Sequence, residues 1–190
     1  VVNKINKSVN LSKQLLVKDS LKSLTDISKK IRLNSLAKVI AITGSCGKTS
    51  LKALLGNTLG KISKVSYSPK SYNNKYGVPL SIFNINKYDD FNIFEIGMDK
   101  KGEIDSLSKI IKPDVGVITN ISYAHAKNFK NLNQIAEAKS EIINNISSNG
   151  SLVLNADDIF FKKQKKIALK NNLKIYSFSL RKSNANVYIK

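Results

Sequence analysis

The sequence KVIAITGSCGKTSLKALL occupies residues 38–55 and decides the class of fold. It begins with an apolar run of strand length (KVIAIT), which is typical of a parallel strand buried on both faces. The glycine-containing stretch GSCGKTS follows at residues 44–50. Leucines then recur at helical spacing over residues 51–59, so we expect an amphipathic helix that ends near Gly60. These residues predict a strand, a glycine-rich loop and a helix in direct succession.

The loop after this strand has the residue types that bind a nucleotide phosphate. Gly44 and Gly47 allow backbone N–H groups to approach phosphate oxygens, and the following helix adds the positive end of its dipole. Lys48 can reach the β- and γ-phosphates, while the Thr49 hydroxyl can bind Mg²⁺. The glycine that opens the longer P-loop motif is replaced by Ile42, which leaves the shorter GxxGKT form. A plain glycine turn is the alternative, and the strand–loop–helix context disfavours it.

Strand-like and helix-like segments alternate along the rest of the chain, without an internal repeat or a low-complexity linker. Further strands are predicted over residues 64–68, 91–97, 114–120, 151–155 and 173–178. Helices are predicted over residues 19–34, 79–83, 103–111, 132–146 and 157–171. A polar tail follows the last strand. This order predicts an α/β fold of the P-loop type, with a mostly parallel sheet and helices on both faces.

Composition excludes several classes of protein. With 190 residues, 42% of them hydrophobic, the chain can form a core and is not a disordered tail. No apolar run reaches the roughly 20 residues of a membrane span, and the N-terminus does not resemble a signal peptide. The single Cys46 excludes a disulfide framework and a cysteine zinc site, and it favours a reducing, cytoplasmic compartment. Met98 is the only methionine, so we expect a piece of a longer chain.

The formal net charge of +19 raises the alternative of a nucleic-acid or anionic membrane partner. However, only Arg32 and Arg181 among the 32 basic residues are arginines, whereas bidentate recognition of guanine or phosphate favours arginine. The lysines are scattered along the whole chain. We therefore expect solvated lysine-rich faces, no nucleic-acid partner and no membrane insertion.

Polar residues collect where the predicted strands end. Glu95 lies inside an otherwise apolar strand, where an unpaired carboxylate is costly to bury. A Mg²⁺ ion held by Thr49 and Glu95 would give that carboxylate a partner. Asn120 and Asn155 end two other strands, and His125 follows shortly after the first of them. Ligands bind outside the carboxyl ends of strands in open α/β sheets, although a lone histidine is also common as a structural residue.

Lys139 is the anomaly of the helix predicted over residues 132–146. The apolar residues of this helix form a stripe, and Lys139 falls in the middle of it. Its ammonium group either extends to water along the protein surface, as lysines often do, or enters a site beside the phosphates or the metal. The residues alone leave both interpretations open.

Several motifs together resemble the Mur ligase family of ATP-dependent enzymes that form amide bonds in peptidoglycan synthesis. ITGSCGKTS is similar to the family's phosphate loop. The segments SYNNKYGVPLSIF, FEIGMDKKGEI, TNISYAHAKNF, IAEAKSEI and LNADD follow in the family's order, so the resemblance covers residues 38–158. The combination is most similar to the members that add D-alanyl-D-alanine to UDP-N-acetylmuramoyl-tripeptide.

The resemblance implies a role for the phosphate loop and for the metal ligands. The ATP phosphates would be bound by Gly44, Ser45, Cys46, Gly47, Lys48, Thr49 and Ser50. Thr49 and Glu95 would bind a first Mg²⁺. His125 and a carbamylated Lys139 would bind a second metal ion. Lys48, His125 and Lys139 are thereby expected to act in catalysis.

The resemblance also implies contacts with the organic parts of both substrates. Asn120 and Asn155 would lie on the adenine side of ATP, whereas Asn73 and Asn74 would face the UDP-linked substrate. Cys46 stands where serine or asparagine is more usual in the family, which leaves the backbone of the loop unaffected.

The implied reaction is stepwise. ATP would phosphorylate the terminal carboxylate of the tripeptide, giving an acyl phosphate and ADP, and the amine of D-alanyl-D-alanine would then displace phosphate.

The resemblance also implies how the chain is divided. Residues 1–36 would be the end of a preceding domain and a linker helix, and residues 37–190 an ATP-binding domain that is incomplete at its C-terminus. We expect the enzyme to be a monomer and these 190 residues to be inactive alone. The alternatives are a sibling Mur ligase, a folylpolyglutamate synthase, or a P-loop protein that binds nucleic acid.

Overall fold

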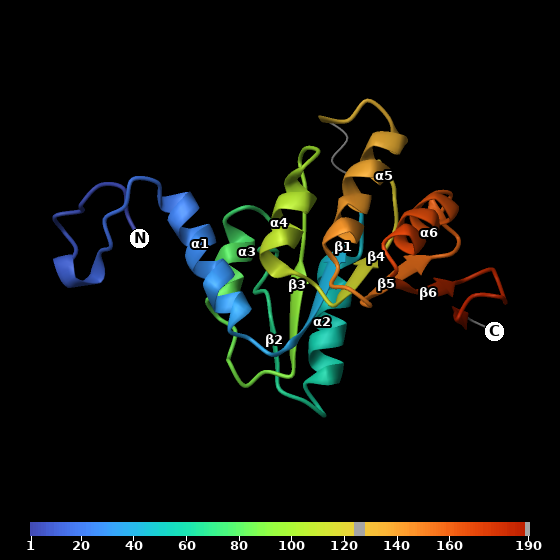
Figure 1. The fold of residues 1–190 in the computed structure, drawn as a ribbon, viewed down its shortest axis with the longest axis horizontal. Helices are drawn as coiled ribbons and strands as arrows, with labels where there is room; N and C mark the ends of the chain where they lie inside the picture. Colours follow the sequence, from blue (N-terminus) through green and yellow to red (C-terminus); the bar gives the residue numbers. More distant parts are fainter. Residues whose placement is uncertain (124–127, 189–190) are drawn as a thin grey trace.

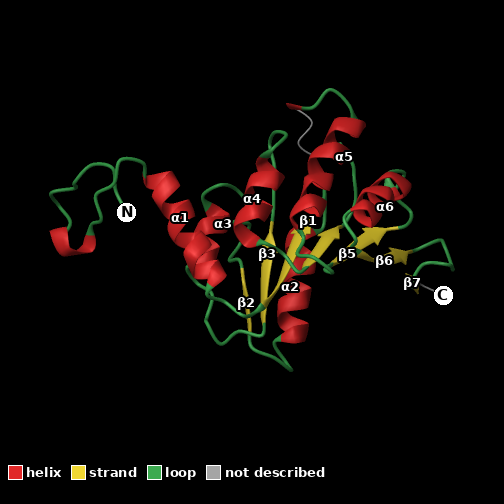
Figure 2. Ribbon diagram, viewed as in Figure 1, coloured by secondary structure: helices red, strands yellow, loops and turns green. Residues whose placement is uncertain are grey.

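The computed structural model describes residues 1–123 and 128–188. Its centre is one seven-stranded sheet in the order β2-β3-β1-β4-β5-β6-β7 (Figures 1 and 2). The strands are β1 (Lys38–Thr43), β2 (Val65–Tyr67), β3 (Phe91–Glu95), β4 (Val115–Ile118), β5 (Ser151–Asn155), β6 (Lys174–Ser179) and β7 (Val187–Tyr188). Every pairing between these strands is parallel. The predicted α/β class with a parallel sheet is confirmed.

Helices cover both faces of the sheet, as predicted. They are α1 (Ser20–Leu33), α2 (Lys48–Leu59), α3 (Gly77–Ile82), α4 (Glu103–Ile111), α5 (Leu132–Ser140) and α6 (Phe161–Lys170). Helices α3 to α6 contribute to the larger core cluster, together with Val39 and Ala41 of β1. Helix α2 packs on the opposite face, where its leucines cover Ile42 of β1 and Ile93 of β3. None of the helices in the described part of the chain is long and apolar enough to cross a membrane.

Some element boundaries differ from the predictions. The helix predicted over residues 132–146 ends at Ser140 and continues as a 3₁₀ helix over Glu141–Asn145. The sequence predicts Pro79 as the first residue of its helix, but α3 begins at Gly77. The proline therefore lies within the first turn, where a backbone N–H needs no helical partner. The polar tail contains β7, which pairs with the end of β6. Strand β7 was not predicted because it has two residues, both exposed, which are too few to show the alternating pattern of a strand.

The topology places β1 where the direction of the strand order reverses. Strands β2 and β3 lie on one side of β1, and β4 to β7 lie on the other. Ile42 of β1 pairs with Glu95 of β3, and Thr43 pairs with Ile118 of β4. The segments that follow these three strands therefore meet at one edge of the sheet. This switch point is where open α/β sheets bind ligands.

Helix α1 is fixed to the sheet domain by one of the two arginines. Arg32, near the end of α1, donates from Nε to the Ile111 carbonyl at 2.7 Å and from Nη2 to the Lys112 carbonyl at 3.2 Å. These carbonyls end α4, so the guanidinium satisfies groups that the helix leaves without partners. The Arg32 guanidinium also lies 3.8 Å from the Asp114 carboxylate. The end of the 1–36 segment is thus bound to the same fold that holds the phosphate loop.

Candidate active site

The loop of residues 44–47 connects β1 to α2, which begins at Lys48. Gly44 has a φ of 144°, and a Cβ atom built on it would lie 1.9 Å from Thr119 Oγ1. Gly47 is the N-cap residue of α2 and has a left-handed φ of 80°. The first position needs glycine for close approach, and the second needs it for backbone conformation. The predicted strand–loop–helix unit is confirmed.

The segment after β4 holds the backbone of this loop. The Ser45 N–H donates to the Asn120 carbonyl, and the Cys46 N–H donates to the Asn120 side-chain oxygen, both at 3.0 Å. The Thr119 hydroxyl donates to the Cys46 carbonyl at 2.6 Å. Asn120, singled out from its place at a strand end, therefore contacts the loop directly. The loop conformation is fixed by the neighbouring strand as well as by its own glycines.

The Lys48 side chain folds over the loop that precedes it. Its ammonium group donates to the Gly44 carbonyl at 2.8 Å and lies 3.4 Å from the Ser45 carbonyl. The N-terminus of α2 adds its first-turn N–H groups and the positive end of the helix dipole at the same place. An anion bound on this loop would meet an ammonium group and several backbone donors.

Glu95 ends β3, and its carboxylate is buried against the start of α2, with the residue 1% exposed. The Thr49 hydroxyl donates to Glu95 Oε2 at 2.8 Å, and Asn73 Nδ2 donates to Oε1 at 2.8 Å. The Lys52 ammonium lies 3.3 Å from Oε2. Both carboxylate oxygens therefore have donors, which offsets the cost of burying the charge. The structure brings Thr49 and Glu95 together, as the sequence-based hypothesis of a shared metal requires.

The chemistry of this pair fits Mg²⁺. Magnesium prefers oxygen ligands and is usually held by one or two carboxylates together with substrate phosphates. Glu95 supplies a carboxylate and Thr49 a hydroxyl, side by side at the N-terminus of α2. Among the described residues, no group of three or more His, Cys, Asp or Glu residues could hold a metal ion. Thr49 and Glu95 therefore fit a metal ion whose other ligands include phosphate oxygens of a nucleotide.

Lys52 belongs to the site although no motif points to it. Only 2% of its surface is exposed, and its ammonium group also donates to the backbone carbonyl of Lys70. Lys52 stands three residues before Leu55, so it lies on the side of α2 that faces the sheet. A lysine within an apolar stripe is the pattern that singles out Lys139. The same pattern identifies Lys52.

Lys139 of α5 approaches the loop from the face of the sheet opposite α2. The residue is 2% exposed, and its pKa is lowered to about 7. Burial is the main cause, the positive charge of Lys48 adds to it, and Cys46 acts in the opposite direction. Within the described part of the chain, Lys139 forms no ion pair. Its ammonium group does not extend to bulk water, so the surface interpretation is wrong.

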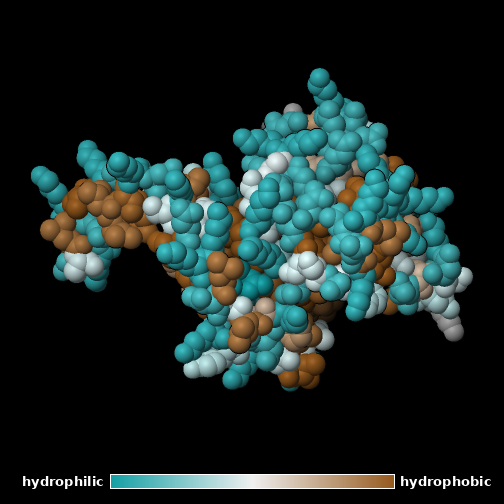
Figure 3. All heavy atoms as spheres, in the orientation of Figure 1, coloured by the Kyte–Doolittle hydropathy of each residue, from teal (hydrophilic) through white to brown (hydrophobic). Residues whose placement is uncertain are grey.

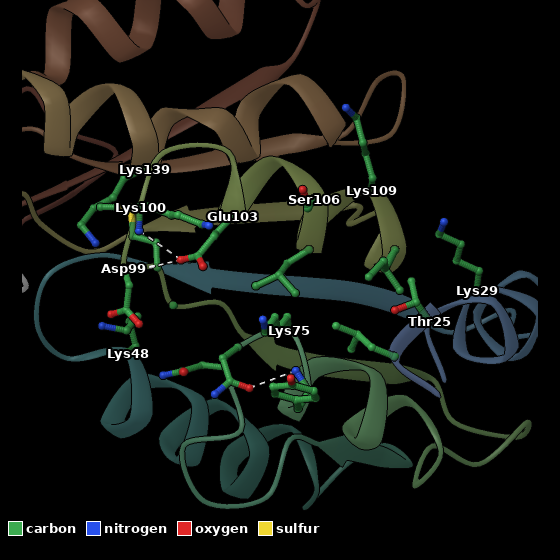
Figure 4. A pocket seen from close by; sticks show the side chains of 18 residues that line it. Thr25, Lys29, Lys48, Lys75, Asp99, Lys100, Glu103, Ser106, Lys109 and Lys139 are labelled. Carbon is green, nitrogen blue, oxygen red and sulfur yellow. Dashed lines mark hydrogen bonds between the residues drawn. The ribbon is translucent and has the colours of Figure 1, made fainter. Parts of the chain in front are cut away.

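A pocket of about 650 Å³ lies beside the loop and is lined by α1, α4, α5 and the segment before α3 (Figure 4). Lys48 and Lys139 lie at one end, and Lys29 and Lys109 lie at the other. The lysines that line it are Lys29, Lys48, Lys75, Lys100, Lys109 and Lys139, and the carboxylates are Asp99 and Glu103. The N–H groups of Asp99 and Lys100 donate to Glu103. The excess of positive charge favours an anionic ligand.

The two asparagines predicted to face substrate both line this pocket. Asn73 donates to Glu95, and its own carbonyl accepts from the Gly97 N–H at 2.7 Å. The Asn74 side chain accepts from the N–H groups of Tyr76 and Gly77 and so fixes the turn just before α3. Asn73 therefore joins the pocket wall to the buried carboxylate of Glu95, and Asn74 shapes the wall beside it.

The remaining predicted site residues are less closely connected to the loop. Asn155 ends β5, two strands from β1, and its side chain accepts from the Asp157 N–H at 2.9 Å. Ser50 lies on the exposed side of the first turn of α2. His125 lies outside the described residues.

Comparison with known proteins gives a consistent result. Residues 42–190 match the Mur ligase middle domain. A UDP-N-acetylmuramoyl-tripeptide–D-alanyl-D-alanine ligase of Rickettsia prowazekii is 40% identical over 180 residues, covering 92% of this chain and 40% of the relative. An enzyme of the same name from Buchnera aphidicola is 33% identical over 181 residues, with the same coverage of both chains. The chain thus spans about 40% of the length of these relatives.

Solved structures agree with the sequence matches. A crystal structure of MurF from Acinetobacter baumannii has a TM-score of 0.85 and 34% identity, covering 92% of this chain and 38% of that one. MurF ligase from Thermotoga maritima, solved in complex with ADP, has a TM-score of 0.80 and 31% identity, covering 93% and 40%. A folylpolyglutamate synthase/dihydrofolate synthase from Yersinia pestis, at 15% identity and a TM-score of 0.61, shares the fold alone. The matched family, the relatives and the phosphate-loop geometry together show that this chain belongs to the Mur ligase family.

Proposed function

We propose that the protein containing this chain is an ATP-dependent ligase that adds D-alanyl-D-alanine to UDP-N-acetylmuramoyl-tripeptide. The observation that carries this proposal is the meeting of the phosphate loop, the buried Glu95 and the cationic pocket at one edge of the sheet. The relatives named for this reaction, with 33–40% identity over 92% of the chain, support the choice of substrates. Folylpolyglutamate synthases resemble the chain in fold alone.

In the proposed reaction, residues 44–50, which are the loop and the first residues of α2, bind the ATP phosphates. The Lys48 ammonium group, now on the Gly44 carbonyl, would move to the β- and γ-phosphates and offset negative charge during transfer. The tripeptide carboxylate would approach from the pocket, where Lys48 and Lys139 lie together. Acyl phosphate formation links a carboxylate oxygen to the γ-phosphorus and releases ADP. The amine of D-alanyl-D-alanine then forms the amide as phosphate leaves.

Thr49 and Glu95 would hold Mg²⁺ beside the phosphates. Bound there, the ion neutralises charge on the transferring phosphoryl group. Glu95 is already oriented for this role by Thr49 on one oxygen and by Asn73 on the other. The chain's own contribution is therefore a carboxylate that is preformed and shielded from bulk water.

Lys139 would carry the carbamate that the family resemblance implies. A neutral lysine amine adds CO₂ to give a carbamate and a proton, and a pKa of about 7 makes the neutral amine abundant near neutral pH. The carbamate would be an anion in the cationic end of the pocket. Together with His125, it would hold a second metal ion.

The other predicted contacts stay proposals. Asn73 and Asn74 would face the UDP-linked substrate from the pocket wall, and Asn120 and Asn155 would lie on the adenine side of ATP. Asn120 contacts the loop through the Cys46 N–H, which supports a place near the nucleotide. We further propose that the protein acts as a monomer and without a nucleic-acid partner.

The division of the chain is also part of the proposal. Residues 1–36 would be the end of a preceding domain and a linker helix, and residues 37–190 an incomplete ATP-binding domain. Helix α2 packs mainly on β1, β2 and β3, and Tyr176 of β6 and Val187 of β7 are 49% and 68% exposed. This partly uncovered sheet supports a domain that continues with further structure. The 190 residues alone are expected to form no ligation product.

The test uses the full-length protein, ATP, Mg²⁺ and UDP-N-acetylmuramoyl-tripeptide with a panel of amines. We expect ADP and an amide product with D-alanyl-D-alanine, and no product with D-glutamate or diaminopimelate. Tripeptide labelled with ¹⁸O in its terminal carboxylate should transfer one label to the released phosphate, because the acyl phosphate contains that oxygen. Product with another amine would identify a sibling ligase, and an unlabelled phosphate would exclude the acyl phosphate.

A further inference from the structure

Glu95 shares its buried carboxylate with an ammonium group of the same chain. The Lys52 and Glu95 side chains are 3% and 2% exposed, and Lys52 Nζ lies 3.3 Å from Glu95 Oε2. The same oxygen accepts the hydrogen bond from Thr49. Any divalent cation held by Thr49 and Glu95 must therefore bind close to a positive charge.

Lys52 is held at this place by two separate parts of the fold. Its ammonium group donates to Glu95 of β3 and to the Lys70 carbonyl in the segment after β2. The Ser68 hydroxyl of the same segment accepts from the Glu95 N–H at 3.3 Å, so the segment and the strand end are joined. Because its side chain is enclosed between them, Lys52 cannot leave Glu95 without opening the packing around it.

The charges on the loop then decide when a metal ion can bind. Glu95 contributes one negative charge, whereas Lys52 contributes a positive charge and Lys48 a second one on the same loop. The N-terminus of α2 adds further positive potential. A free divalent cation meets no net attraction at such a site, whereas the phosphates of a nucleotide bring several negative charges.

We propose that Lys52 is a positioning residue that couples divalent-cation binding to nucleotide binding. Its ammonium group is the resident counter-ion of Glu95, and it keeps the carboxylate oriented while disfavouring a metal ion without phosphate. The metal ion therefore enters as part of a metal–nucleotide complex. This inference rests on the proposed role of Glu95 as a metal ligand.

The experiment measures Mn²⁺ binding to the full-length protein by electron paramagnetic resonance, with and without ADP. Lys52→Met removes the charge and keeps an unbranched side chain, so we expect Mn²⁺ alone to bind roughly tenfold or more tighter than in the unmutated protein. The factor by which ADP strengthens Mn²⁺ binding should therefore fall, and by linkage Mn²⁺ should strengthen ADP binding by the same smaller factor. The matched control is Lys61→Met, which removes the same charge at an exposed position just beyond α2 and should change neither value.

Two further variants separate the possible failures. Lys52→Gln also removes the charge but keeps a donor for the buried acceptors, so it provides the measurement should Lys52→Met not fold. Unchanged or weaker binding of Mn²⁺ alone in the folded charge-free variant would overturn the counter-ion role. Glu95→Gln should weaken Mn²⁺ binding in the presence of ADP. If it does not, the proposed metal role of Glu95 fails, whatever the result at Lys52.

Discussion

Two lysines lie on opposite sides of the phosphate loop and are equally buried, but they differ in their neighbours. Lys52 and Lys139 are both 2% exposed. Lys52 lies beside the carboxylate of Glu95, whereas the charge that acts on Lys139 most strongly is the ammonium group of Lys48. A carboxylate offsets the cost of burying an ammonium group, while a second cation adds to it.

This difference shows that the charged neighbour, together with burial, decides what a buried lysine can do. At pH 7.4, an ordinary lysine is neutral in only about one molecule in a thousand. Burial and Lys48 lower the pKa of Lys139 to about 7, so its neutral form is abundant at that pH. Lys139 is thus suited to react with CO₂, whereas Lys52 is suited to hold Glu95 in place.

The largest expected effect is the loss of ligation in Lys139→Ala of the full-length protein. Without the carbamate, the proposed second metal ion loses an anionic ligand, and we expect ligation to fall by roughly a thousandfold, or about 4 kcal/mol in the activation free energy. The rate of amide formation at saturating substrates measures this effect.

Chemical rescue separates the carbamate from a packing role for Lys139. Formate or acetate should partly restore ligation in Lys139→Ala, because a small carboxylate can replace the carbamate in the cavity left by the side chain. The unmutated protein should weaken when bicarbonate is removed from the buffer. Near-normal ligation by Lys139→Ala, or no rescue by either acid, would exclude the carbamate.

The same comparison shows what the sequence could predict. The strand–loop–helix unit and the alternation of elements follow from local patterns, so the sheet and the phosphate loop were predictable. Lys139 was recognisable because a lysine interrupts an apolar stripe. The pairing of Lys52 with Glu95 joins residues 43 positions apart, and the contact of Asn73 with Glu95 joins residues 22 apart. Such contacts depend on strand order, which local periodicity does not contain.

The second expected effect is on stability, where the substitution of Lys52 should cost more than the substitution of Lys139. Lys52→Met leaves Glu95 without its buried counter-ion, so we expect the free energy of unfolding to fall by about 3–5 kcal/mol. Lys139→Met removes an ammonium group that has no carboxylate partner in the described structure, so we expect little change or a small gain. Urea unfolding of both full-length variants, followed by circular dichroism, measures the difference. Equal destabilisation of the two would mean that their partners do not distinguish them.

The third effect concerns Lys48, which acts on both the nucleotide and Lys139. Lys48→Ala removes a charge-assisted contact with the phosphates, worth about 1.5–3 kcal/mol, so ATP affinity should fall roughly tenfold to a hundredfold. Ligation should be lost while the fold is kept, because the partners of Lys48 among residues 1–123 and 128–188 are carbonyls of its own loop. Unchanged ATP turnover would remove the phosphate-loop assignment.

The smallest expected effect, measured per pH unit, is a pH dependence of stability that belongs to Lys139. Its pKa in the folded protein is about 7, below the value of about 10.4 expected in the unfolded chain. Between these values the unfolded chain binds more protons than the folded one, so stability should rise as the pH rises from about 7 to about 10. Below about pH 7 both states are protonated, and the contribution becomes constant at its least favourable value.

The slope that one proton can cause is at most about 1.4 kcal/mol per pH unit. Lys139→Met provides the matched control, because it removes this proton and keeps an apolar stem at the same position. Urea unfolding of both proteins between pH 7 and pH 9.5, in buffer freed of CO₂ so that no carbamate forms, isolates the contribution as a difference between two curves. Only the unmutated protein should gain stability over this range relative to the variant. Parallel curves would show that Lys139 keeps its proton in the folded state, in which case the neutral amine required for carbamate formation is not supplied by burial.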